Sequence, residues 1–208
     1  MSDMIGKPWV MTDKTFGFIT HILPDGKTVL ELGSGYSTEN LSKHYTMYSI
    51  EHNKKWIGKG NSTYIYASVI EYKDGEAPDV PGLEKLDHKI QIGWYDPEVV
   101  KNGLQGIKYD LIFIDGPTGR VGRAGFFKYI DLFNASVPIV IDDVVRIGEF
   151  ILMKKIANYI NQSYYVIPDS TKVKNDQIHY FGCINVDPSC FADFTEYYEN
   201  PDSLKDCE

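Results

Sequence analysis

Several acidic residues stand at the ends of short apolar segments, where a carboxylate can hold a ligand or accept a proton. Glu51 ends one such segment, Asp115 ends the run YDLIFI, and the pair Asp142 and Asp143 ends PIVI. A carboxylate that closes a buried strand is unfavourable unless it is paired or binds something. Because ligands of open α/β sheets bind outside the carboxyl ends of the strands, these acids predict a binding or catalytic site there.

A glycine turn precedes these acids in the segment TVLELGSGYST. Residues 28–32 are β-branched and aliphatic around one acid, which predicts a short buried strand. Gly33-Ser34-Gly35 then forces a tight turn, and Ser37 or Thr38 can cap a following helix. Free backbone N–H groups and a positive dipole end meet there, and the glycines let a ligand approach closely. The segment predicts the nucleotide-binding corner of a doubly wound α/β domain, although many such turns have no ligand.

Glu51 is a candidate for binding a ribose. An acid about 20 residues beyond the glycine turn commonly accepts hydrogen bonds from ribose hydroxyls, and Glu51 stands at that distance from Gly33. A solvated glutamate at a strand end is the alternative. A dinucleotide site prefers a third glycine or alanine in G-x-G-x-x-G/A, but that position is Thr38 here.

Two pairs of residues are candidates for contacts with a substrate. Trp94 and Tyr95 could stack on adenine or on a substrate ring, although core packing is an equal alternative. Arg120 and Arg123 lie between glycines in the loop TGRVGR. They could bind an anionic or hydroxylated acceptor, with simple solvent exposure as the alternative.

The elements that must position these residues follow from the apolar pattern and the turn residues. We expect an exposed polar excursion at residues 71–86. The predicted helices are 12–23, 37–43, 124–133 and 148–161. The predicted strands are 28–32, 47–50, 62–70, 89–95, 109–114, 138–141, 164–167 and 177–186, the last two as an antiparallel pair.

The whole chain sets further limits. Its 208 residues, 43% of them hydrophobic, suffice for one domain with a sizeable core. No apolar run approaches a membrane span, and the first residues lack the apolar centre of a signal peptide. Three cysteines without metal spacing suggest a reducing compartment, so we expect a cytoplasmic location. A net charge of −8 without a basic block argues against a nucleic-acid partner.

Five blocks, in order, resemble the class I S-adenosylmethionine-dependent methyltransferases. They are ELGSGYST, SIEHN, GWYDP, YDLIFIDGPTGRVGR and IVIDDVVRIGE, and they span roughly residues 28–150. The likeness is strongest to the branch that accompanies glycan and surface-polysaccharide synthesis. The resemblance implies an α/β fold with a Rossmann-like, doubly wound seven-stranded sheet, order 3-2-1-4-5-7-6. Strand 7 would be antiparallel, and helices would cover both faces.

The resemblance also implies a domain organisation and a set of partners. Residues 1–208 would form a single methyltransferase domain, with a helix and flap in 1–27, the Rossmann-like core in 28–186 and an appendage in 187–208. The cofactor would be S-adenosylmethionine, and the acceptor a small molecule or glycan. A glycosyltransferase would be a partner or fused domain, as in large DNA viruses. The implied cofactor-binding residues are Glu31, Gly33, Ser34, Gly35, Tyr36, Ser37, Thr38, Glu51, His52 and Asp115.

A comparison with metal-dependent O-methyltransferases concerns the acidic trio. Asp115, Asp142 and Asp143 match their positions for acids after strands four and five, and such oxygen ligands suit Mg²⁺ or Mn²⁺. Helix capping and a salt bridge to Arg146 are the alternative for the last two. Since the positions that supply a base in those families are Pro117 and Thr118, the base is unassigned.

His179, Asp143 and Asp115 are the candidate catalytic residues, although His179 could also be a strand histidine bonded to backbone. The leading hypothesis is methylation of a sugar hydroxyl. A methyltransferase for a small phenolic or acid metabolite is the first rival. A nucleotide-dependent oxidoreductase is the second, and a silent domain that only binds a partner is the third.

Overall fold

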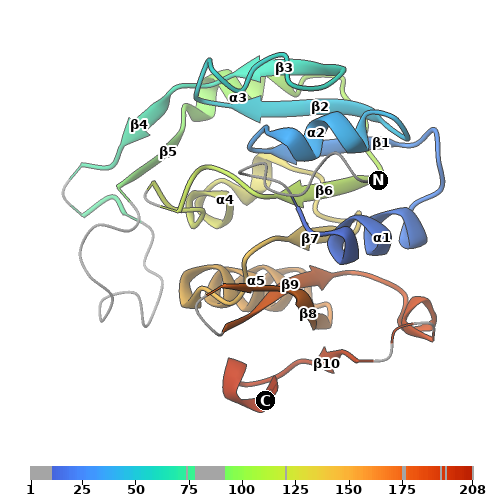
Figure 1. Cartoon of the computed structure of the whole chain (residues 1–208). Helices are drawn as coiled ribbons and strands as arrows, with labels where there is room; N and C mark the ends of the chain where they lie inside the picture. Colours follow the sequence, from blue (N-terminus) through green and yellow to red (C-terminus); the bar gives the residue numbers. More distant parts are fainter. Residues whose placement is uncertain are drawn as a thin grey trace.

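The computed structural model describes residues 11–73, 75–77, 92–119, 121–174, 177–192, 194 and 196–207. In this part of the chain, eight strands form one sheet with helices on both faces (Figure 1). The strand order is β10-β8-β9-β7-β6-β1-β2-β3. The strands are β1 (Thr28–Leu32), β2 (Thr46–Glu51), β3 (Ser62–Tyr66), β6 (Leu111–Ile114), β7 (Ile139–Ile141), β8 (Tyr164–Lys174), β9 (Gln177–Ile184) and β10 (Tyr198–Glu199).

The sheet confirms the predicted strand order and adds one strand. β3, β2, β1, β6 and β7 are parallel, whereas β9 runs antiparallel to both of its neighbours, β7 and β8. β9 is therefore the expected antiparallel seventh strand. The expectation of seven strands was one too few, because β10 pairs with the outer edge of β8. A two-residue strand has no apolar pattern by which it could be predicted.

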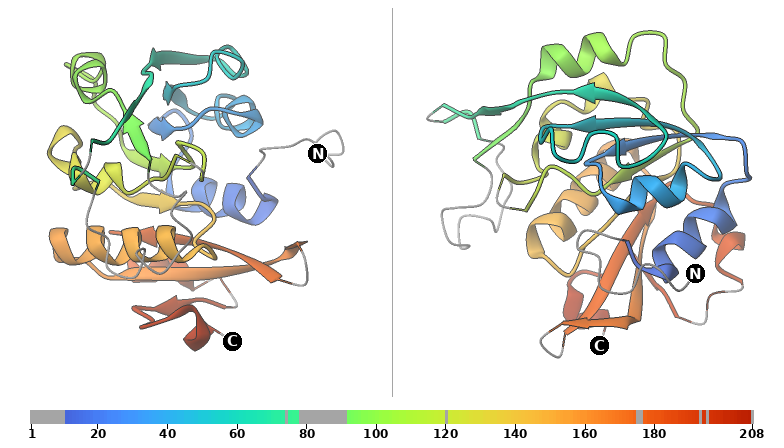
Figure 2. Two further views of the ribbon diagram at one scale, coloured as in Figure 1. Left: turned by 90° about the vertical axis from the view of Figure 1, so that its left-hand side faces the viewer. Right: turned by 45° about the horizontal axis from the view of Figure 1, so that its top comes forward.

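Hydrophobic cores lie on both faces of the sheet, because alternate residues of each strand point to opposite sides. Leu30 and Ile112 pack on the side of α3, α4 and α5, whereas Val29 and Leu111 pack on the side of α1 and α2. Figure 2 shows that helices cover both faces of the sheet. The helices are α1 (Asp13–Ile22), α2 (Tyr36–Leu41), α3 (Pro97–Gly103), α4 (Gly125–Lys128) and α5 (Ile147–Ile160).

A small ribbon replaces part of the predicted third strand. β3 ends at Tyr66, and β4 (Val69–Glu71) leaves the main sheet to pair with β5 (Gly93–Tyr95). The helix α3 that follows β5 was not predicted. Its cap is Asp96, whose side chain accepts hydrogen bonds from the two backbone N–H groups of residues 98 and 99, with Pro97 at the first helical position.

Two other expectations need correction or lie outside the described chain. The predicted helix at 124–133 is shorter, since α4 ends at Lys128 and a 3₁₀ turn, η3 (Ile130–Leu132), follows. The expected flap falls largely on residues 1–10, and most of the expected excursion falls on residues 78–86. Both of these ranges lie outside the described residues.

The β8–β9 hairpin extends past the carboxyl end of β7. Ile141, the last residue of β7, pairs with Gly182 of β9, so the preceding residues of β9 continue beyond that end. His179 lies in this extension, opposite Asp169 of β8. The hairpin therefore forms a wall beside the acids that follow β6 and β7.

The C-terminal residues, in the expected appendage, pack against the core. Phe191 of η4 (Pro188–Phe191) belongs to the core on the α1 side, and Cys207 of η5 (Leu204–Cys207) to the core on the α5 side. Cys183, Cys190 and Cys207 are free thiols. Among the described residues, no helix is long and apolar enough to cross a membrane.

Candidate cofactor and acceptor site

Two glycines from different strand ends bring their backbones into contact. Gly33 follows β1 with φ at +87°, and a Cβ atom added to it would lie 2.7 Å from the backbone nitrogen of Gly116. A Cβ added to Gly116 would lie 2.5 Å from the Cα of Gly33. Neither position has room for a side chain, so the loops after β1 and β6 close together.

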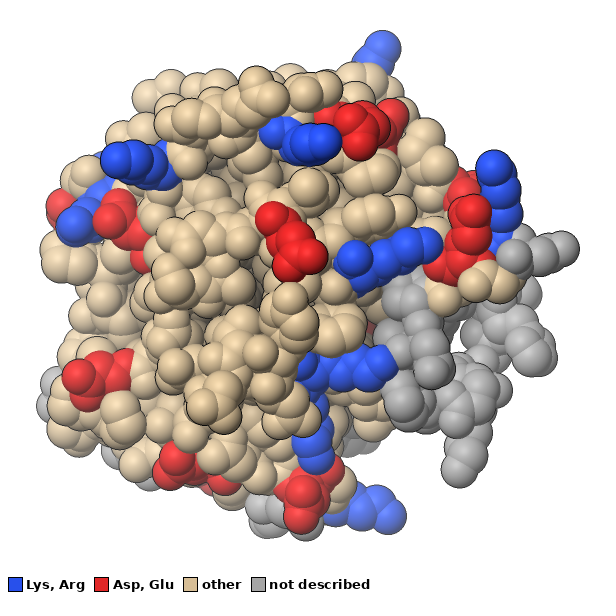
Figure 3. Space-filling view, turned by 180° about the vertical axis from the view of Figure 1, so that it is seen from behind, with Lys and Arg blue, Asp and Glu red and all other residues tan. Residues whose placement is uncertain are grey.

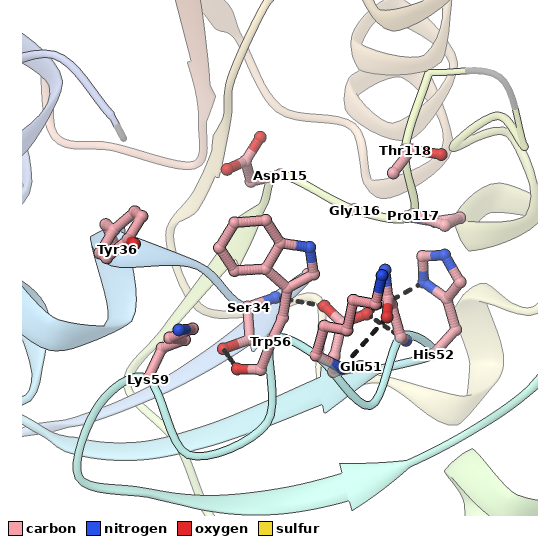
Figure 4. A pocket seen from close by; sticks show the side chains of 13 residues that line it. Ser34, Tyr36, Glu51, His52, Trp56, Lys59, Asp115, Gly116, Pro117 and Thr118 are labelled. Atoms are coloured by element: carbon pink, nitrogen blue, oxygen red, sulfur yellow. Dashed lines mark hydrogen bonds and ion pairs between the residues drawn. The ribbon is translucent and has the colours of Figure 1, made fainter. Parts of the chain in front are cut away.

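A cavity of about 450 Å³ opens beside these glycines, at the carboxyl ends of β1, β2 and β6 (Figure 4). Six residues predicted to bind a cofactor line it, namely Gly33, Ser34, Tyr36, Glu51, His52 and Asp115. Its other lining residues are Asn53, Lys55, Trp56, Lys59, Gly116, Pro117 and Thr118. The cavity thus lies where the strand-end acids predicted a site.

Glu51 is fixed firmly at the cavity wall. Its side chain is almost fully buried, and its Oε2 accepts a hydrogen bond of 2.7 Å from the backbone N–H of Ser34. Oε1 accepts from the backbone N–H of Asn53 and lies 3.2 Å from Nδ1 of His52. Since each carboxylate oxygen has more than one acceptor site, Glu51 can still accept hydrogen bonds from a ligand.

Glu31 lies behind the glycine turn and outside the cavity lining. Its Oε2 accepts hydrogen bonds of 2.7 Å from the hydroxyls of both Thr38 and Ser49. Complete burial raises the pKa of Glu31 to about 8, although these two hydrogen bonds oppose the shift. The Thr38 hydroxyl also accepts from the backbone N–H of Gly35 at 3.1 Å. Glu31 therefore stabilises the turn through its hydrogen bonds to Thr38 and Ser49. A direct contact between Glu31 and the cofactor stays a prediction.

The other residues predicted from the turn have neighbours of their own. Gly35 is the N-cap of α2, and the Ser37 hydroxyl accepts a hydrogen bond of 2.8 Å from the backbone N–H of Met11. Ser37 and Thr38 are buried behind the turn. Their predicted contacts with the cofactor are untested.

Asp115 faces the cavity from the end of β6. Its side chain is 24% exposed, and its Oδ1 lies 3.0 Å from the guanidinium of Arg123. Burial raises the pKa of Asp115 to about 7, helped by the negative charge of Asp142 and opposed by Arg123. Asp115 is therefore a carboxyl group that can gain and lose a proton near neutral pH.

Arg123 ties the ends of β6 and β7 together. Its side chain is only 3% exposed and donates to the backbone carbonyls of Asp115 and Asp142, at 2.6 and 2.8 Å. The acceptor contact expected for Arg123 is not supported by this placement, because its hydrogen-bonding groups are taken by the protein. Arg120 lies outside the described residues.

Trp94 and Tyr95 belong to the core. Both are buried, and the Trp94 ring stacks on Tyr129 with centroids 5.3 Å apart. A Cβ added to Gly116 would lie 2.5 Å from the Tyr95 hydroxyl, which places that hydroxyl directly behind the two touching loops. The expected stacking of these rings on a ligand is therefore corrected to core packing, since the contacts of β5 decide their exposure.

Asp142 and Asp143 meet His179 beyond the end of β7. Nε2 of His179 lies 3.1 Å from Oδ1 of Asp142 and 3.5 Å from Oδ1 of Asp143. Asp143 also forms ion pairs with Arg146 at 2.9 Å and Arg123 at 3.5 Å. Although burial opposes ionisation, the hydrogen bond with His179 and these arginines lower the pKa of Asp143.

The predicted metal set of three carboxylates does not assemble. Ligand atoms of Asp142, Asp143 and His179 lie within 4.8 Å of one another, and this is the one such group among the described residues. Asp115 is not part of this group, and its carboxylate is paired with Arg123 instead. The arginines already offset the negative charge for which a divalent ion was expected. We therefore assign no step to a metal.

Trp56 and Lys59 are cavity residues that the sequence did not reveal. The Trp56 ring meets the ring of Tyr36 edge-on, with centroids 5.9 Å apart, and the backbone carbonyl of Trp56 accepts from the Ser34 hydroxyl. Both residues lie in the loop after β2, just beyond Glu51. A tryptophan so close to a predicted ribose contact was the available signal.

Comparisons with known proteins support the fold. No family model and no curated protein sequence matches the chain. Spermidine synthase from Thermotoga maritima is similar in structure, with a TM-score of 0.51 and 14% sequence identity, over 90% of this chain and 68% of that one. The chain has a Rossmann-like fold. At this level of identity the likeness concerns the fold alone.

Two methyltransferases are also similar, at lower TM-scores. Precorrin-6Y C5,15-methyltransferase from Geobacter metallireducens has 13% identity and a TM-score of 0.47, over 86% of this chain and 91% of that chain. Magnesium protoporphyrin IX methyltransferase from Synechocystis, a structure with bound SAM, has 14% identity and a TM-score of 0.45. That match covers 82% of this chain and 76% of the other.

Proposed function

We propose that this protein is an S-adenosylmethionine-dependent methyltransferase that acts on a hydroxyl group of a sugar or glycan. The resemblance of the sequence blocks and the Rossmann-like fold support the proposal. The observation that carries it is one cavity of about 450 Å³ that contains both Glu51, at the end of β2, and Asp115, at the end of β6. Those are the strand ends where this cofactor needs a ribose acceptor and a group near its methyl.

Each end of the cavity has a chemical task in this proposal. Glu51 accepts hydrogen bonds from the ribose hydroxyls, and the bare backbone of Gly33 lets the cofactor lie close. When bound, the cofactor supplies an electrophilic methyl group on a positively charged sulfur. Asp115 would take the proton of the acceptor hydroxyl as the acceptor oxygen bonds to that methyl group, while the methyl–sulfur bond breaks and S-adenosylhomocysteine is the leaving group. A pKa of about 7 suits this step, because a base is most effective when its pKa lies near the working pH.

Positioning residues surround Asp115. The guanidinium of Arg123 holds its Oδ1 at 3.0 Å and is itself fixed by two backbone carbonyls. Asp143, 18% exposed and held by Arg146 at 2.9 Å, lies 3.5 Å from the same Arg123 guanidinium. In this proposal His179 orients Asp142 and Asp143 and, being buried, does not reach the acceptor itself.

A hydroxyl-rich acceptor fits these residues better than a flat aromatic one. The exposed parts of Asp115 and Asp143 are hydrogen-bond acceptors, which suit neighbouring hydroxyl groups. The aromatic rings that a phenolic acceptor would stack on, Trp94 and Tyr95, are buried. A glycosyltransferase, as a partner or a fused domain, is the proposed source of the acceptor.

A nucleic-acid acceptor is disfavoured by charge. The chain carries a net charge of −8, and on the face seen from behind, basic side chains are interspersed with acidic ones (Figure 3). Strong binding to a phosphate backbone needs a concentration of lysine and arginine side chains.

The deciding experiment is calorimetry with S-adenosylhomocysteine and NAD in parallel. We expect micromolar binding of the first, about −8 kcal/mol, and none of the second. Glu51→Ala should weaken the binding of S-adenosylhomocysteine by about 2–4 kcal/mol, because charge-assisted hydrogen bonds are lost. Glu39→Ala, on α2 outside the cavity lining, is the matched control. Binding of NAD instead would favour the oxidoreductase. If the Glu51→Ala variant bound S-adenosylhomocysteine with unchanged affinity, Glu51 would not belong to the site.

The acceptor class is tested separately. With labelled methyl donor, we expect label transfer to hydroxyls of mono- or oligosaccharides. Transfer to catechols or carboxylic acids, with none to sugars, would leave the methyltransferase in place and replace the proposed acceptor.

A further inference from the structure

Lys59 brings a positive charge into a cavity that also contains two carboxylates and a second lysine, the exposed Lys55. It lines the cavity and is partly buried. Its Nζ lies 5.6 Å from the ring centroid of Tyr36 and 5.8 Å from that of Trp56. The two rings hold the ammonium group by cation–π contacts, so its position at the cavity is defined.

No carboxylate among the described residues forms an ion pair with this ammonium group. Several other basic residues form ion pairs, among them Lys27, Arg123, Arg146 and Lys154. Within the described residues, none of the ion pairs contains Lys59. A partly buried cation in a ligand cavity, without an ion-pair partner in the described part of the chain, indicates an anionic group on the ligand.

Lys59 and the two carboxylates take different places along the cavity (Figure 4). Figure 4 places Tyr36 and Lys59 at one end and His52, Pro117 and Thr118 at the other. Glu51 and Asp115 lie between these ends (Figure 4). A complementary ligand has an anion at the Lys59 end and hydroxyl or cationic groups beside the two acids.

We propose that Lys59, held by Tyr36 and Trp56, is the subsite for the α-carboxylate of the cofactor's amino-acid part. The inference rests on the proposed function and goes beyond it, since it names the group that distinguishes this cofactor from its decarboxylated counterpart. The ribose then meets Glu51, the sulfur and amine lie toward Asp115, and the carboxylate reaches Lys59.

The test compares two ligands that differ only in that carboxylate. S-adenosylhomocysteine has it, whereas S-adenosyl-3-thiopropylamine keeps the adenosine, sulfur and amine without it. In calorimetry the wild type should bind the first about tenfold more tightly, because a partly exposed charge pair contributes roughly that much. Lys59→Met, which keeps an unbranched stem against the rings, should lose this preference. It should leave the affinity for the thiopropylamine unchanged.

Two further variants make the result specific. Lys59→Arg retains the charge and should retain the preference. Lys54→Met is the matched control, because Lys54 lies over the Tyr66 ring at 5.1 Å, is exposed and does not line the cavity. It should behave as wild type toward both ligands.

The outcomes separate this inference from the proposed function. If Lys59→Met binds S-adenosylhomocysteine as tightly as wild type, the carboxylate subsite is overturned while the cofactor assignment stands. Equal weakening of both ligands would also overturn it, since the lysine would then support the cavity in general. If wild type binds neither ligand, the proposed function fails and this inference fails with it.

Discussion

Two opposing effects act on the pKa of Asp115. Burial and the charge of Asp142 favour its protonated form, whereas Arg123 favours the carboxylate, and the net pKa is about 7. A carboxyl group with such a pKa, exposed at a cavity, is a candidate general base on physical grounds. The charge network around it makes the assignment testable through the pH dependence of turnover.

Turnover should rise with pH through about 7, because only the ionised form of Asp115 can accept a proton. Asp115→Asn should lower kcat by about 100-fold or more and abolish this titration. The affinity for S-adenosylhomocysteine, measured by calorimetry, should change much less. A variant with full activity and the wild-type pH profile would exclude Asp115 as the base.

Some of the residues that the sequence singled out line the cavity and others do not, for a physical reason. Glu51 and Asp115 could be found because their places at strand ends follow from the apolar pattern. The exposure of Arg123, Trp94 and Tyr95 depends on how loops from distant strands pack. Only the folded structure reveals that Arg123 is enclosed by carbonyls and that both aromatic rings lie in the core.

At the scale of elements, the β1–α2 turn is built on a buried carboxyl group. Glu31 anchors Thr38 and Ser49, which connects β1 with α2 and β2. Its pKa is about 8 in the folded protein against 4.5 as the ordinary value. Between these pH values the folded protein keeps a proton that the unfolded chain releases. The stabilisation is therefore fully present below about pH 4.5 and is lost as the pH rises to about 8.

Glu31→Gln should remove this pH dependence, since an amide can accept the same two hydroxyl hydrogen bonds without titrating. The free energy of unfolding of the variant minus that of wild type should increase by a few kcal/mol as the pH rises from 5 to 8. Urea unfolding at several pH values measures it, with Glu39→Gln on α2 as the control. Parallel stability curves for Glu31→Gln and wild type would contradict the burial of a protonated Glu31.

The elements that the sequence predicted best are the long or fully buried ones. β1 and the other central strands follow from apolar runs, whereas their order in the sheet was implied by the family resemblance. The β4–β5 ribbon and β10 are short, and their pairing is decided by which strand edges remain open. α3 begins at an Asp-Pro pair that indicates a cap, but its apolar face is too short to read as a helix.

The ends of β6, β7 and β9 meet in a charge network that should work without a metal. Arg123 and Arg146 already offset the carboxylates of Asp115 and Asp143. Methyl transfer should therefore persist in excess EDTA and be unaffected by added Mg²⁺ or Mn²⁺. Loss of turnover in EDTA, restored by either ion, would reinstate the metal hypothesis with Asp142, Asp143 and His179 as ligands.

At the scale of the whole molecule, the C-terminal segment closes the edge of the sheet. β10 covers β8, and Asn200 holds Tyr164 through its side chain and backbone, each at 2.9 Å. The Tyr164 hydroxyl donates to the carbonyl of Pro201 at 2.6 Å. An open edge of this kind invites pairing with other chains, so the segment protects the fold at a place far from the cavity.

Removal of residues 196–208 should therefore separate stability from ligand binding. The truncated protein should melt about 5–10 °C lower, because several buried hydrogen bonds and apolar contacts are lost. It should also tend to associate through the uncovered β8 edge, which light scattering would detect. Its affinity for S-adenosylhomocysteine should stay near that of the full chain, since the cavity is lined by residues 33–118. Asn200→Ala should lower the melting temperature in the same direction by a smaller amount. An unchanged melting temperature in the truncated protein would show that β10 does not stabilise the sheet. A large loss of affinity for S-adenosylhomocysteine would show that the segment supports the cavity as well.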